Sequence, residues 1–574
     1  MQFNIEVNNK VIQVKRGETI LSALSRNGII VPTLCSMKDF SPTGACRICV
    51  VEVEGKENLV PSCSTPVEES MRIKTHSTRV IKARKTLVEL LLSNHPDDCL
   101  YCDSNGNCEL QDLSIDLNIR ERRISGKKSR FKLDISSPGL VREPAKCILC
   151  SRCVRVCDEQ QSVSTYEFIN RGNRTTIGTT MSQDLNFSSC IYCGQCILAC
   201  PTGALHERSG IEEVTDALNN PSLTVVVQYD PAIFASISEE FGLKPGKDMD
   251  GIICSALQKI GFKYIFDTSF AADLVINEMA EEMVQRVTQG VYHPLISSNC
   301  PAWIKYCEQF FPDLLPMVSS CKSPQQMMGS IIKSLFSIEK GLNPNSIYSV
   351  SVVPCIARKF EAQREEMTNK AISDIDVVIT ARELIKLIKL YGIDIQNIGV
   401  NNSDQQFSFR SSAGKLFALS GGTTEGLFRT VHNRLTGKDI SNPKFPELRS
   451  INGIKEVDLK VGGRLFKTII VNGLHGVNKV LDGLGKGTFQ PDFVEIMACP
   501  GGCINGGGQN CAYKEKDLKV KAKTIYDIDE AEPIKNAHKN PLIPDVYNKY
   551  FEKAGSDKAK QFLHTRYTRK DVLK

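Results

Sequence analysis

Two short runs at the start of the chain alternate hydrophobic and polar residues. They cover residues 3–7 and 11–14, with two asparagines between them. Such alternation predicts half-buried strands, and the asparagines are typical of a hairpin turn. Residues 19–26 follow with apolar positions at helical spacing. We therefore expect a small β-grasp domain over residues 1–79.

From about residue 210, apolar strands alternate with helical stretches. The strand candidates are 223–228, 348–353, 377–379 and 493–497, and the helix candidates are 275–287, 325–338 and 385–391. This alternation predicts a large α/β domain with a mostly parallel sheet over residues 210–515. Residues 516–574 are rich in lysine and predict a small helical domain. The expected fold class is therefore multidomain α+β.

Composition and charge exclude some classes of function. The longest apolar stretches, such as residues 223–229, fall short of the roughly 20 residues needed to cross a bilayer, and no secretory signal is visible. We expect a cytoplasmic protein that binds no membrane. The net charge of +6 is small for 574 residues, so we expect no nucleic-acid partner. The basic segment 120–132 fits a solvated linker or a docking patch for an acidic electron carrier.

Cysteine is the most informative residue type. Two copies of the motif C-x2-C-x2-C-x3-C occur, at Cys147, Cys150, Cys153 and Cys157, and at Cys190, Cys193, Cys196 and Cys200. At this spacing three cysteines of one repeat and the fourth of the other hold a 4Fe-4S cluster. We therefore expect a two-cluster ferredoxin domain at 140–209, with Cys200 joining the first three cysteines and Cys157 joining Cys190, Cys193 and Cys196. Zinc sites usually use two separated C-x-x-C pairs, which disfavours zinc.

Two further sets of metal-ligating residues precede this repeat. The first, Cys35, Cys46, Cys49 and Cys63, has the spacing of a β-grasp iron–sulfur domain, with zinc as the alternative. The second, His95, Cys99, Cys102 and Cys108, lies within residues 80–125 and is ambiguous by itself, because a Cys3His zinc site would use the same ligands.

Four more cysteines follow predicted strands of the α/β domain. Cys300 follows the apolar pair 295–296, Cys355 follows strand 348–353, and Cys499 and Cys503 follow strand 493–497. Loops at the carboxyl ends of such strands gather at one edge of the sheet, so a buried metal site is expected there. The glycines at 501–502 and 506–508 indicate close approach of the backbone to something bulky.

These loops resemble the signature segments of FeFe hydrogenases. The resemblance rests on Ser297-Ser298-Asn299-Cys300-Pro301, on Pro354-Cys355-Ile356-Ala357-Arg358, and on Met497-Ala498-Cys499-Pro500-Gly501-Gly502-Cys503. The N-terminal motifs are similar to those of the larger monomeric clostridial type. The resemblance implies one 2Fe-2S cluster, three accessory 4Fe-4S clusters including the one with His95, and an H-cluster. In that cofactor the four cysteines would hold a 4Fe-4S cube, and Cys503 would bridge to a two-iron subcluster carrying carbon monoxide, cyanide and an azadithiolate.

The same resemblance assigns pocket and proton-relay positions. Arg358 stands where a lysine is usual, and Pro231, Pro324, Gln325, Phe417 and Met497 match pocket positions. Family members usually have a proton-carrying cysteine where this chain has Asn299 and a glutamate where it has Met279. The later relay positions, Ser319 and Glu282, are retained. Asp230 replaces a usually small residue and offers a second proton route, as does Glu281.

We therefore expect a ferredoxin hydrogenase that reversibly reduces protons to H2, with atypical proton transfer. The expected partners are ferredoxin or flavodoxin and the hydrogenase maturation proteins. A low-turnover regulatory or H2-sensing relative is the main alternative. An iron–sulfur assembly protein or an NADH dehydrogenase subunit is disfavoured by the catalytic loops. The chain lacks a G-x-G-x-x-G fingerprint after a strand, so direct NAD(P) binding is not expected.

Overall fold

The chain folds into two compact units. The computed structural model describes all residues except 1, 122, 130, 244–248, 292, 370, 401–406, 408, 450–452, 511–514 and 572–574, and describes no side chains at 515–517. The first unit comprises Met1–Glu159, Ser164–Ser188 and Ala199–His206, and the second comprises Gln160–Val163, Ser189–Leu198 and Glu207–Lys574. The double cysteine motif is thus divided, because Cys190, Cys193 and Cys196 belong to the second unit.

The first unit begins with a five-stranded sheet in the order β2-β1-β5-β3-β4. Its strands are β1 (Gln2–Val7), β2 (Lys10–Lys15), β3 (Val50–Val53), β4 (Val60–Pro61) and β5 (Arg72–Lys74). Asn8 and Asn9 have φ of 50° and 65°, as a tight hairpin turn requires. Helix α1 (Ile20–Arg26) is capped by Thr19, whose hydroxyl accepts a hydrogen bond from Ser22 N. The predicted hairpin and helix are confirmed.

Two helices follow in the first unit. Helix α2 (Thr78–Asn94) begins at the capping residue Ser77, and its buried Arg84 donates to the carbonyl oxygens of Ile48 at 3.0 Å and Val50 at 2.8 Å. These bonds tie the helix to the loop and strand β3 that carry Cys49. The remaining elements of this unit include α3 (Glu109–Asp116), β6 (Leu140–Arg142), α4 (Arg152–Arg155), β7 (Glu167–Ile169) and β8 (Thr176–Gly178).

The second unit contains two sheets. The first has the order β11-β10-β13-β16 with all neighbours parallel, and the second has the order β12-β19-β18-β17, in which only the β17–β18 pair is antiparallel. Their strands are β10 (Thr224–Tyr229), β11 (Tyr264–Asp267), β12 (Leu295–Ile296), β13 (Ile347–Val353), β16 (Val377–Thr380), β17 (Ile454–Val461), β18 (Arg464–Asn472) and β19 (Phe493–Met497). The predicted parallel α/β arrangement is confirmed.

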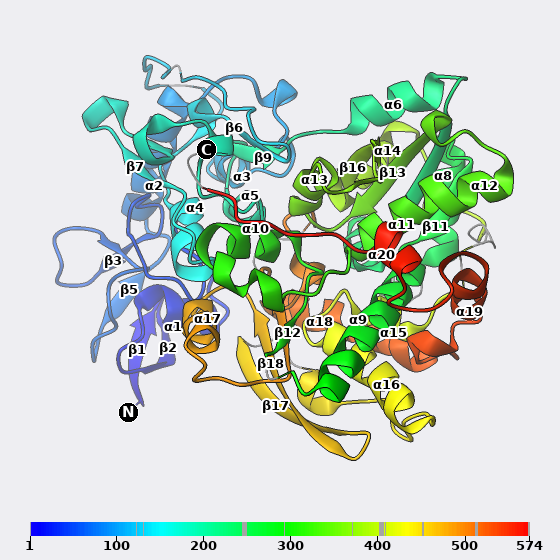
Figure 1. The fold of residues 1–574 in the computed structure, drawn as a ribbon. Helices are drawn as coiled ribbons and strands as arrows, with labels where there is room; N and C mark the ends of the chain where they lie inside the picture. Colours follow the sequence, from blue (N-terminus) through cyan, green and yellow to red (C-terminus); the bar gives the residue numbers. More distant parts are fainter. Residues whose placement is uncertain are drawn as a thin grey trace. The chain divides into compact units, whose positions relative to one another are not determined.

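Long helices cover these sheets (Figure 1). Helix α9 (Ser269–Gln289) packs against α11 (Pro324–Ile331), α15 (Ser412–Leu416) and α16 (Gly422–Thr436). The helix expected at 325–338 is interrupted, because a π-helical turn at Ile332–Phe336 separates α11 from α12 (Ser337–Lys340). The other helices are α5 (Gln195–Ala199), α6 (Ile211–Asn219), α7 (Phe234–Glu240), α8 (Asp250–Ile260), α10 (Pro301–Phe310), α13 (Ala357–Ala362), α14 (Ala381–Leu390) and α17 (Val477–Gly485).

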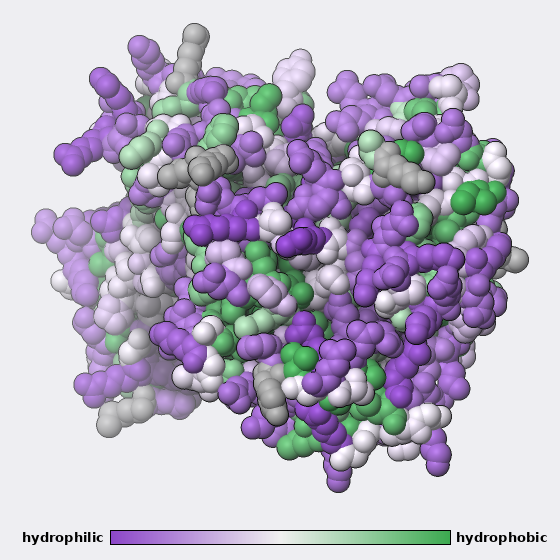
Figure 2. Space-filling view, in the orientation of Figure 1, coloured by the Kyte–Doolittle hydropathy of each residue, from purple (hydrophilic) through white to green (hydrophobic). Residues whose placement is uncertain are grey.

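The C-terminal segment is helical, as expected. It contains α18 (Glu515–Ala531), α19 (Leu542–Val546) and α20 (Asp557–Leu563), and α20 packs against α11. Among the described residues, no helix is both long and apolar enough to span a bilayer. The face drawn in Figure 2 is largely hydrophilic, with hydrophobic residues in small scattered groups.

Candidate active site

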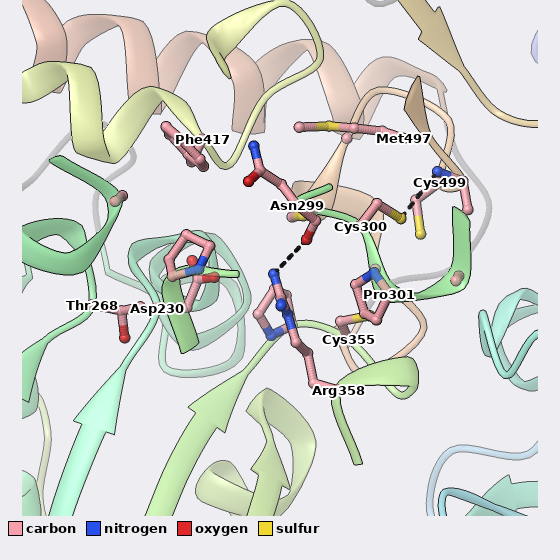
Figure 3. Close-up of a pocket in the computed structure, with 18 of the residues that line it drawn as sticks. Asp230, Thr268, Asn299, Cys300, Pro301, Cys355, Arg358, Phe417, Met497 and Cys499 are labelled. Atoms are coloured by element: carbon pink, nitrogen blue, oxygen red, sulfur yellow. Dashed lines mark hydrogen bonds between the residues drawn. The ribbon is translucent and has the colours of Figure 1, made fainter. Parts of the chain in front are cut away.

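The four cysteines predicted for the catalytic centre line one cavity in the second unit (Figure 3). Cys355 and Cys499 are buried on its wall, and Cys300 and Cys503 are half-buried there. Four converging thiols are the ligand set of an iron–sulfur cluster. The residues present therefore fit a multi-iron cofactor.

The strand topology explains why these cysteines meet. Cys300 is the N-cap of α10 directly after β12, Cys355 lies between β13 and α13, and Cys499 and Cys503 follow β19. Strand β19 runs parallel to β12, and β13 runs parallel to its neighbours in the other sheet. The cysteines thus follow the carboxyl ends of strands, where open α/β sheets bind ligands.

The glycines after Cys503 pack against protein backbone. A Cβ atom on Gly506 would lie 2.2 Å from the carbonyl oxygen of Pro354, and one on Gly507 would lie 2.5 Å from that of Cys193. Any side chain at these positions would clash with backbone that cannot move away cheaply. The sequence predicted that these glycines lie against something bulky. At Gly506 and Gly507 the bulky neighbour is the backbone of the loops that carry Cys355 and Cys193.

Two N–H groups point at sulfur atoms of the site. The amide nitrogen of Ala498 donates to Cys300 Sγ at 3.5 Å, and Gln195 Nε2 donates to Cys499 Sγ at 3.3 Å. Such donors stabilise charge on metal-bound sulfur. Burial raises the pKa of Cys355 to about 12, so a coordinating cation is needed to keep its thiolate at neutral pH. Sequence reasoning missed Gln195, because nothing in its motif marks it beyond its position between two cysteines.

Arg358 places a positive charge at the cavity. Its Nη1 donates to Glu361 Oε2 at 2.6 Å and its Nη2 donates to the carbonyl oxygen of Asn299 at 2.9 Å. Burial by itself lowers the pKa of Arg358, but the charge of Glu361 outweighs it and raises that pKa. The guanidinium therefore stays charged and fixed in orientation, and Figure 3 shows it directed toward Asn299.

Asn299 holds its side chain at the cavity wall. Its Nδ2 donates to Thr423 Oγ1 at 3.2 Å, whereas its Oδ1 is buried and has no hydrogen-bond partner within the described structure. A buried acceptor without a hydrogen bond costs about 1–3 kcal/mol of stability. The position of Asn299 Oδ1 at the cavity therefore suits a hydrogen bond from a donor on a bound group. Phe417 and Met497 also line the cavity and, with Asn299, form the wall drawn at the top of Figure 3.

Asp230 is the one carboxylate among the described residues that line the cavity. It follows β10, precedes Pro231, which also lines the cavity, and its Oδ1 accepts a hydrogen bond from Ala232 N at 2.8 Å. Burial raises the pKa of Asp230, with Arg358 opposing the rise. The carboxyl group therefore keeps a proton to a higher pH than an exposed aspartate does.

Pro324 and Gln325 have different places. Pro324 lines the cavity. Gln325 does not line it and instead contacts residues that do or that hold them in place. The Oε1 of Gln325 accepts from Ser351 Oγ at 3.0 Å, and its Nε2 donates to Glu361 Oε2 at 3.3 Å. Gln325 thus fixes the carboxylate that orients Arg358.

Of the expected relay positions, Asn299 lines the cavity, whereas Met279, Glu282 and Ser319 do not. Met279 lies on α9 and is fully buried in the hydrophobic core, and Glu282 is half-buried on the same helix. Ser320, rather than Ser319, hydrogen-bonds to Glu282, with Oγ to Oε1 at 2.6 Å. Ser319 Oγ instead accepts from Cys321 N at 3.2 Å.

The double cysteine motif has the same local geometry in both copies. Leu149 and Tyr192 both have positive φ, of 55° and 56°, and each donates its backbone N–H to the first cysteine of its motif at 3.4 Å. Cys147, Cys150, Cys153 and Cys200 line one cavity in the first unit, as their assignment to one cluster requires. Cys157 lies in the first unit and Cys190, Cys193 and Cys196 in the second, so the other cluster's ligand set stays a prediction.

The N-terminal ligand sets lie in the first unit. The thiols of Cys35, Cys46, Cys49 and Cys63 are in contact, and the neighbouring Cys63 lowers the pKa of Cys49 to about 6. His95 follows α2 as its C-cap and is buried, whereas Cys99 is exposed. Burial raises the pKa of Cys108, and the neighbouring Cys102 and Cys99 add to the rise.

Four cysteines lie outside the motifs. Cys254, Cys307 and Cys321 are fully buried, and Cys511 lies outside the described residues. Cys321 has a further feature, because its sulfur lies within 4.8 Å of ligand atoms of Glu282 and His564.

Comparison with known protein families covers nearly the whole chain. Residues 223–507 match the family "Iron only hydrogenase large subunit, C-terminal domain". The other matches are a 2Fe-2S iron-sulfur cluster binding domain (1–78), the NADH-ubiquinone oxidoreductase-G iron-sulfur binding region (84–123), a 4Fe-4S dicluster domain (146–204) and the iron hydrogenase small subunit (515–570).

Individual relatives agree with these matches. The chain is 39% identical to the NADP-reducing hydrogenase subunit HndD of Solidesulfovibrio fructosivorans, over all of both chains. It is 35% identical to iron hydrogenase 1 of Clostridium pasteurianum, over 98% of this chain and 99% of that protein. The solved structure of apo FeFe-hydrogenase HydA1 from Chlamydomonas reinhardtii matches with a TM-score of 0.57 and 31% identity, over 63% of this chain and all of that one.

The chain belongs to the family of iron-only, or FeFe, hydrogenases. Segments that match iron–sulfur cluster domains precede the catalytic domain, and a segment that matches the iron hydrogenase small subunit follows it. The predicted family is thereby confirmed in preference to an iron–sulfur assembly protein or an NADH dehydrogenase subunit.

Proposed function

We propose that this protein is a hydrogenase that reversibly reduces protons to H2 with electrons exchanged with ferredoxin or flavodoxin. The observation that carries the proposal is the convergence of Cys300, Cys355, Cys499 and Cys503 on one buried cavity.

The residues at the cavity fit the H-cluster. Cys300, Cys355, Cys499 and Cys503 would hold its cube, and Cys503 would also join the two-iron subcluster, which maturation proteins would install. When bound, the cofactor supplies an open iron that polarises H2 and an amine that exchanges its proton. Arg358 contributes a fixed cationic donor, and the apolar wall with Phe417 and Met497 excludes water.

Proton delivery is the part of the proposal most specific to this chain. Asn299 does not titrate, and the thioether of Met279 cannot carry a proton. Asp230 supplies a protonatable group at the cavity, and burial raises its pKa above that of an exposed aspartate. We expect Asp230 to be the inner proton carrier, with Glu281 and Glu282 as candidates for the outer part of the route.

Electrons would reach the cavity through the loop that carries Cys193. Cys193 lines the same cavity as the four catalytic cysteines, and Gln195 bonds to one of them. The sequence also supports three accessory 4Fe-4S clusters and one 2Fe-2S cluster as the rest of the electron route.

The His95 cluster is the best candidate for electron entry from the carrier. Leu100 and Tyr101, between Cys99 and Cys102, are 86% and 90% exposed. An exposed apolar contact over a cluster suits brief docking of a small redox protein. The basic segment 120–132 is less suited, because its Arg123 pairs with Glu89 and its Lys132 pairs with Asp184.

Two observations each favour a different alternative. The relative from Solidesulfovibrio fructosivorans is named as an NADP-reducing subunit, so NADP reached through another subunit is an alternative electron acceptor. The altered positions Asn299 and Met279 also suit a slow, H2-sensing protein.

Turnover by the matured, anaerobic protein separates these candidates. We expect H2 evolution with reduced ferredoxin and none with NADPH when the chain is alone. Evolution with NADPH alone would contradict the ferredoxin assignment. H2-dependent reduction of the clusters with negligible turnover on either donor would favour the sensor.

A further inference from the structure

A buried lysine lies beside the accessory cysteine motif that adjoins the catalytic cavity. Lys305 is on α10, whose N-cap is Cys300, and it is only 8% exposed. Its ammonium group lies 5.1 Å from the centre of the Tyr192 ring and 5.4 Å from that of Phe360 on α13. Tyr192 belongs to the motif, and its backbone N–H donates to Cys190 Sγ at 3.4 Å. Helix α10 therefore carries a catalytic ligand at its start and a cation beside the accessory motif.

Gln309 connects this ammonium group to the same loop. It lies one turn after Lys305 on α10. With the amide of Gln309 oriented to satisfy both of its ends, Lys305 Nζ donates to the amide oxygen at 2.6 Å. The amide nitrogen then donates to the carbonyl oxygen of Ser189 at 3.2 Å, and Ser189 directly precedes Cys190. Two rings and an amide thus hold the lysine in place, and none of these groups carries a net charge.

Lys305 pairs with no carboxylate among the described residues. The charge of Glu308 acts on it, but Glu308 is engaged by Arg364, whose Nη1 and Nη2 donate to it at 3.0 and 2.5 Å. Buried lysines are normally paired with an acid. Five others in the described part of the second unit do pair with a carboxylate, at 2.6 to 3.3 Å: Lys322, Lys333, Lys359, Lys415 and Lys521. The negative charge that balances Lys305 therefore has to come from another kind of group.

The sulfur atoms of the motif supply such a charge. Burial lowers the pKa of Lys305, whereas the charge of Cys190 raises it. An iron–sulfur cluster held by four thiolates is anionic, and each electron that it accepts makes it more negative. A cation nearby therefore stabilises the reduced form more than the oxidised form. Water screens this attraction little, because both Lys305 and Tyr192 are buried.

We propose that Lys305 is the internal counter-ion of the 4Fe-4S cluster held by Cys190, Cys193 and Cys196, and that its charge raises the reduction potential of this cluster. The inference rests on the proposed function, because it places that cluster on the electron route. Cys193 also lines the catalytic cavity, so this cluster adjoins the centre that uses the electrons. In each transfer the cluster gains one electron from the preceding cluster and later passes it to the catalytic cube. Lys305 keeps its proton, and no bond forms or breaks.

A raised potential at this position matches the electron count of the reaction. Forming one H2 molecule consumes two electrons, whereas small iron–sulfur and flavin carriers deliver them singly. A cluster that is stabilised in its reduced form holds one electron beside the catalytic centre until it is used. Lys305 would thus act on electron supply and not on the chemistry at the open iron.

A purely structural role is the competing assignment, because cation–π contacts also stabilise folds. The second unit contains a second lysine over two rings. The ammonium group of Lys340 lies 5.9 Å from the ring centres of both Tyr264 and Phe336. Lys340 is exposed, however, and lies outside every cysteine motif. Lys340→Met is therefore the matched control, since it removes the same kind of contact without removing a charge beside a cluster motif.

An EPR-monitored redox titration tests the proposal in protein that carries its accessory clusters but no two-iron subcluster. The signal that is lost in Cys190→Ala identifies the cluster. Lys305→Met and Lys305→Gln are both neutral, and each should lower the ratio of reduced to oxidised cluster about tenfold at the native midpoint potential. This change corresponds to a fall of about 59 mV for a one-electron couple. Lys305→Arg, which keeps the charge, and Lys340→Met should leave the potential at its native value.

The variants separate the effect of charge from that of packing. A native potential in both neutral variants, or an equal fall in Lys305→Arg, would overturn the counter-ion role. The measurement does not depend on turnover, so it also separates this inference from the proposed function. The expected shifts in a protein that never turns over H2 would support the counter-ion and refute the proposed function. Rapid H2 turnover with unshifted potentials would do the reverse.

Discussion

Gln195 Nε2 donates a hydrogen bond to Cys499 Sγ at 3.3 Å and to the carbonyl oxygen of Asn505 at 2.8 Å. Gln195 lies between Cys193 and Cys196 of an accessory cluster motif, and Cys499 belongs to the catalytic set. One side chain therefore links the last cluster of the proposed electron route to the centre that uses the electrons.

Replacing Gln195 by an apolar residue of similar shape should change the reduction potential of the active-site cube. In Gln195→Met the donor to sulfur is lost, so the more negative, reduced state of the active-site cube is less stabilised and its reduction potential should fall. An EPR-monitored redox titration measures this. Gln326→Met, which changes another buried glutamine of the same unit, is the control. Equal potentials in both variants and the native protein would contradict the link.

The metal content of the first unit tests the His95 site. We expect four accessory clusters besides the active-site cube, and no stoichiometric zinc. His95→Ala should lose the iron of one 4Fe-4S cluster, and His76→Ala, a histidine of the same unit outside every motif, should lose none. Zinc at one equivalent in the native protein, with one cluster fewer, would show that this site holds zinc.

Restoring the family's proton carriers should accelerate turnover. A missing acid–base group typically costs ~10²–10⁴-fold in rate, so Asn299→Cys combined with Met279→Glu should recover part of that factor. H2 evolution at saturating electron donor measures it. Met279→Leu is the control, because it keeps the site apolar. A double variant no faster than the native protein would show that protons already arrive by another complete route.

Asp230 is our candidate for that other route. Asp230→Asn keeps an oxygen that can accept from Ala232 N but removes the proton-carrying group, so turnover should fall by ~10²-fold or more. Asp267→Asn changes another buried aspartate of the same sheet that does not line the cavity, and serves as the control. If native turnover is fast and Asp230→Asn leaves it unchanged, Asp230 does not deliver protons to the active site.

Much of the fold was predictable because its signals are local. The hairpin turn at Asn8 and Asn9, and the apolar strand 493–497, are encoded in runs of a few residues, and the structure agrees with both. The hairpin of β17 and β18 was not predicted. The signal was present and was missed, because residues 457–461 alternate apolar and charged side chains and two glycines follow them, as in a hairpin turn.

The site was predictable where ligands lie in recognisable local segments, and less so where side chains meet across the fold. Local sequence identified the four catalytic cysteines, because each lies in a loop after an apolar strand and in a segment that resembles a known family, and all four line one cavity. It could not identify Gln195, Thr423 or His564, whose partners are distant in the sequence and depend on tertiary packing. The bond from Ser320 to Glu282, in place of Ser319, is likewise a matter of one residue's orientation at the end of a loop.

The central claim is that the cavity lined by Cys300, Cys355, Cys499 and Cys503 holds an H-cluster, and infrared spectroscopy of the matured protein tests it most directly. We predict bands from iron-bound carbon monoxide and cyanide in the native protein, their loss in Cys503→Ser, and their retention in Cys307→Ser, which changes a buried cysteine outside the site. Absence of these bands in the fully matured native protein, or unchanged bands and full activity in Cys503→Ser, would contradict the account.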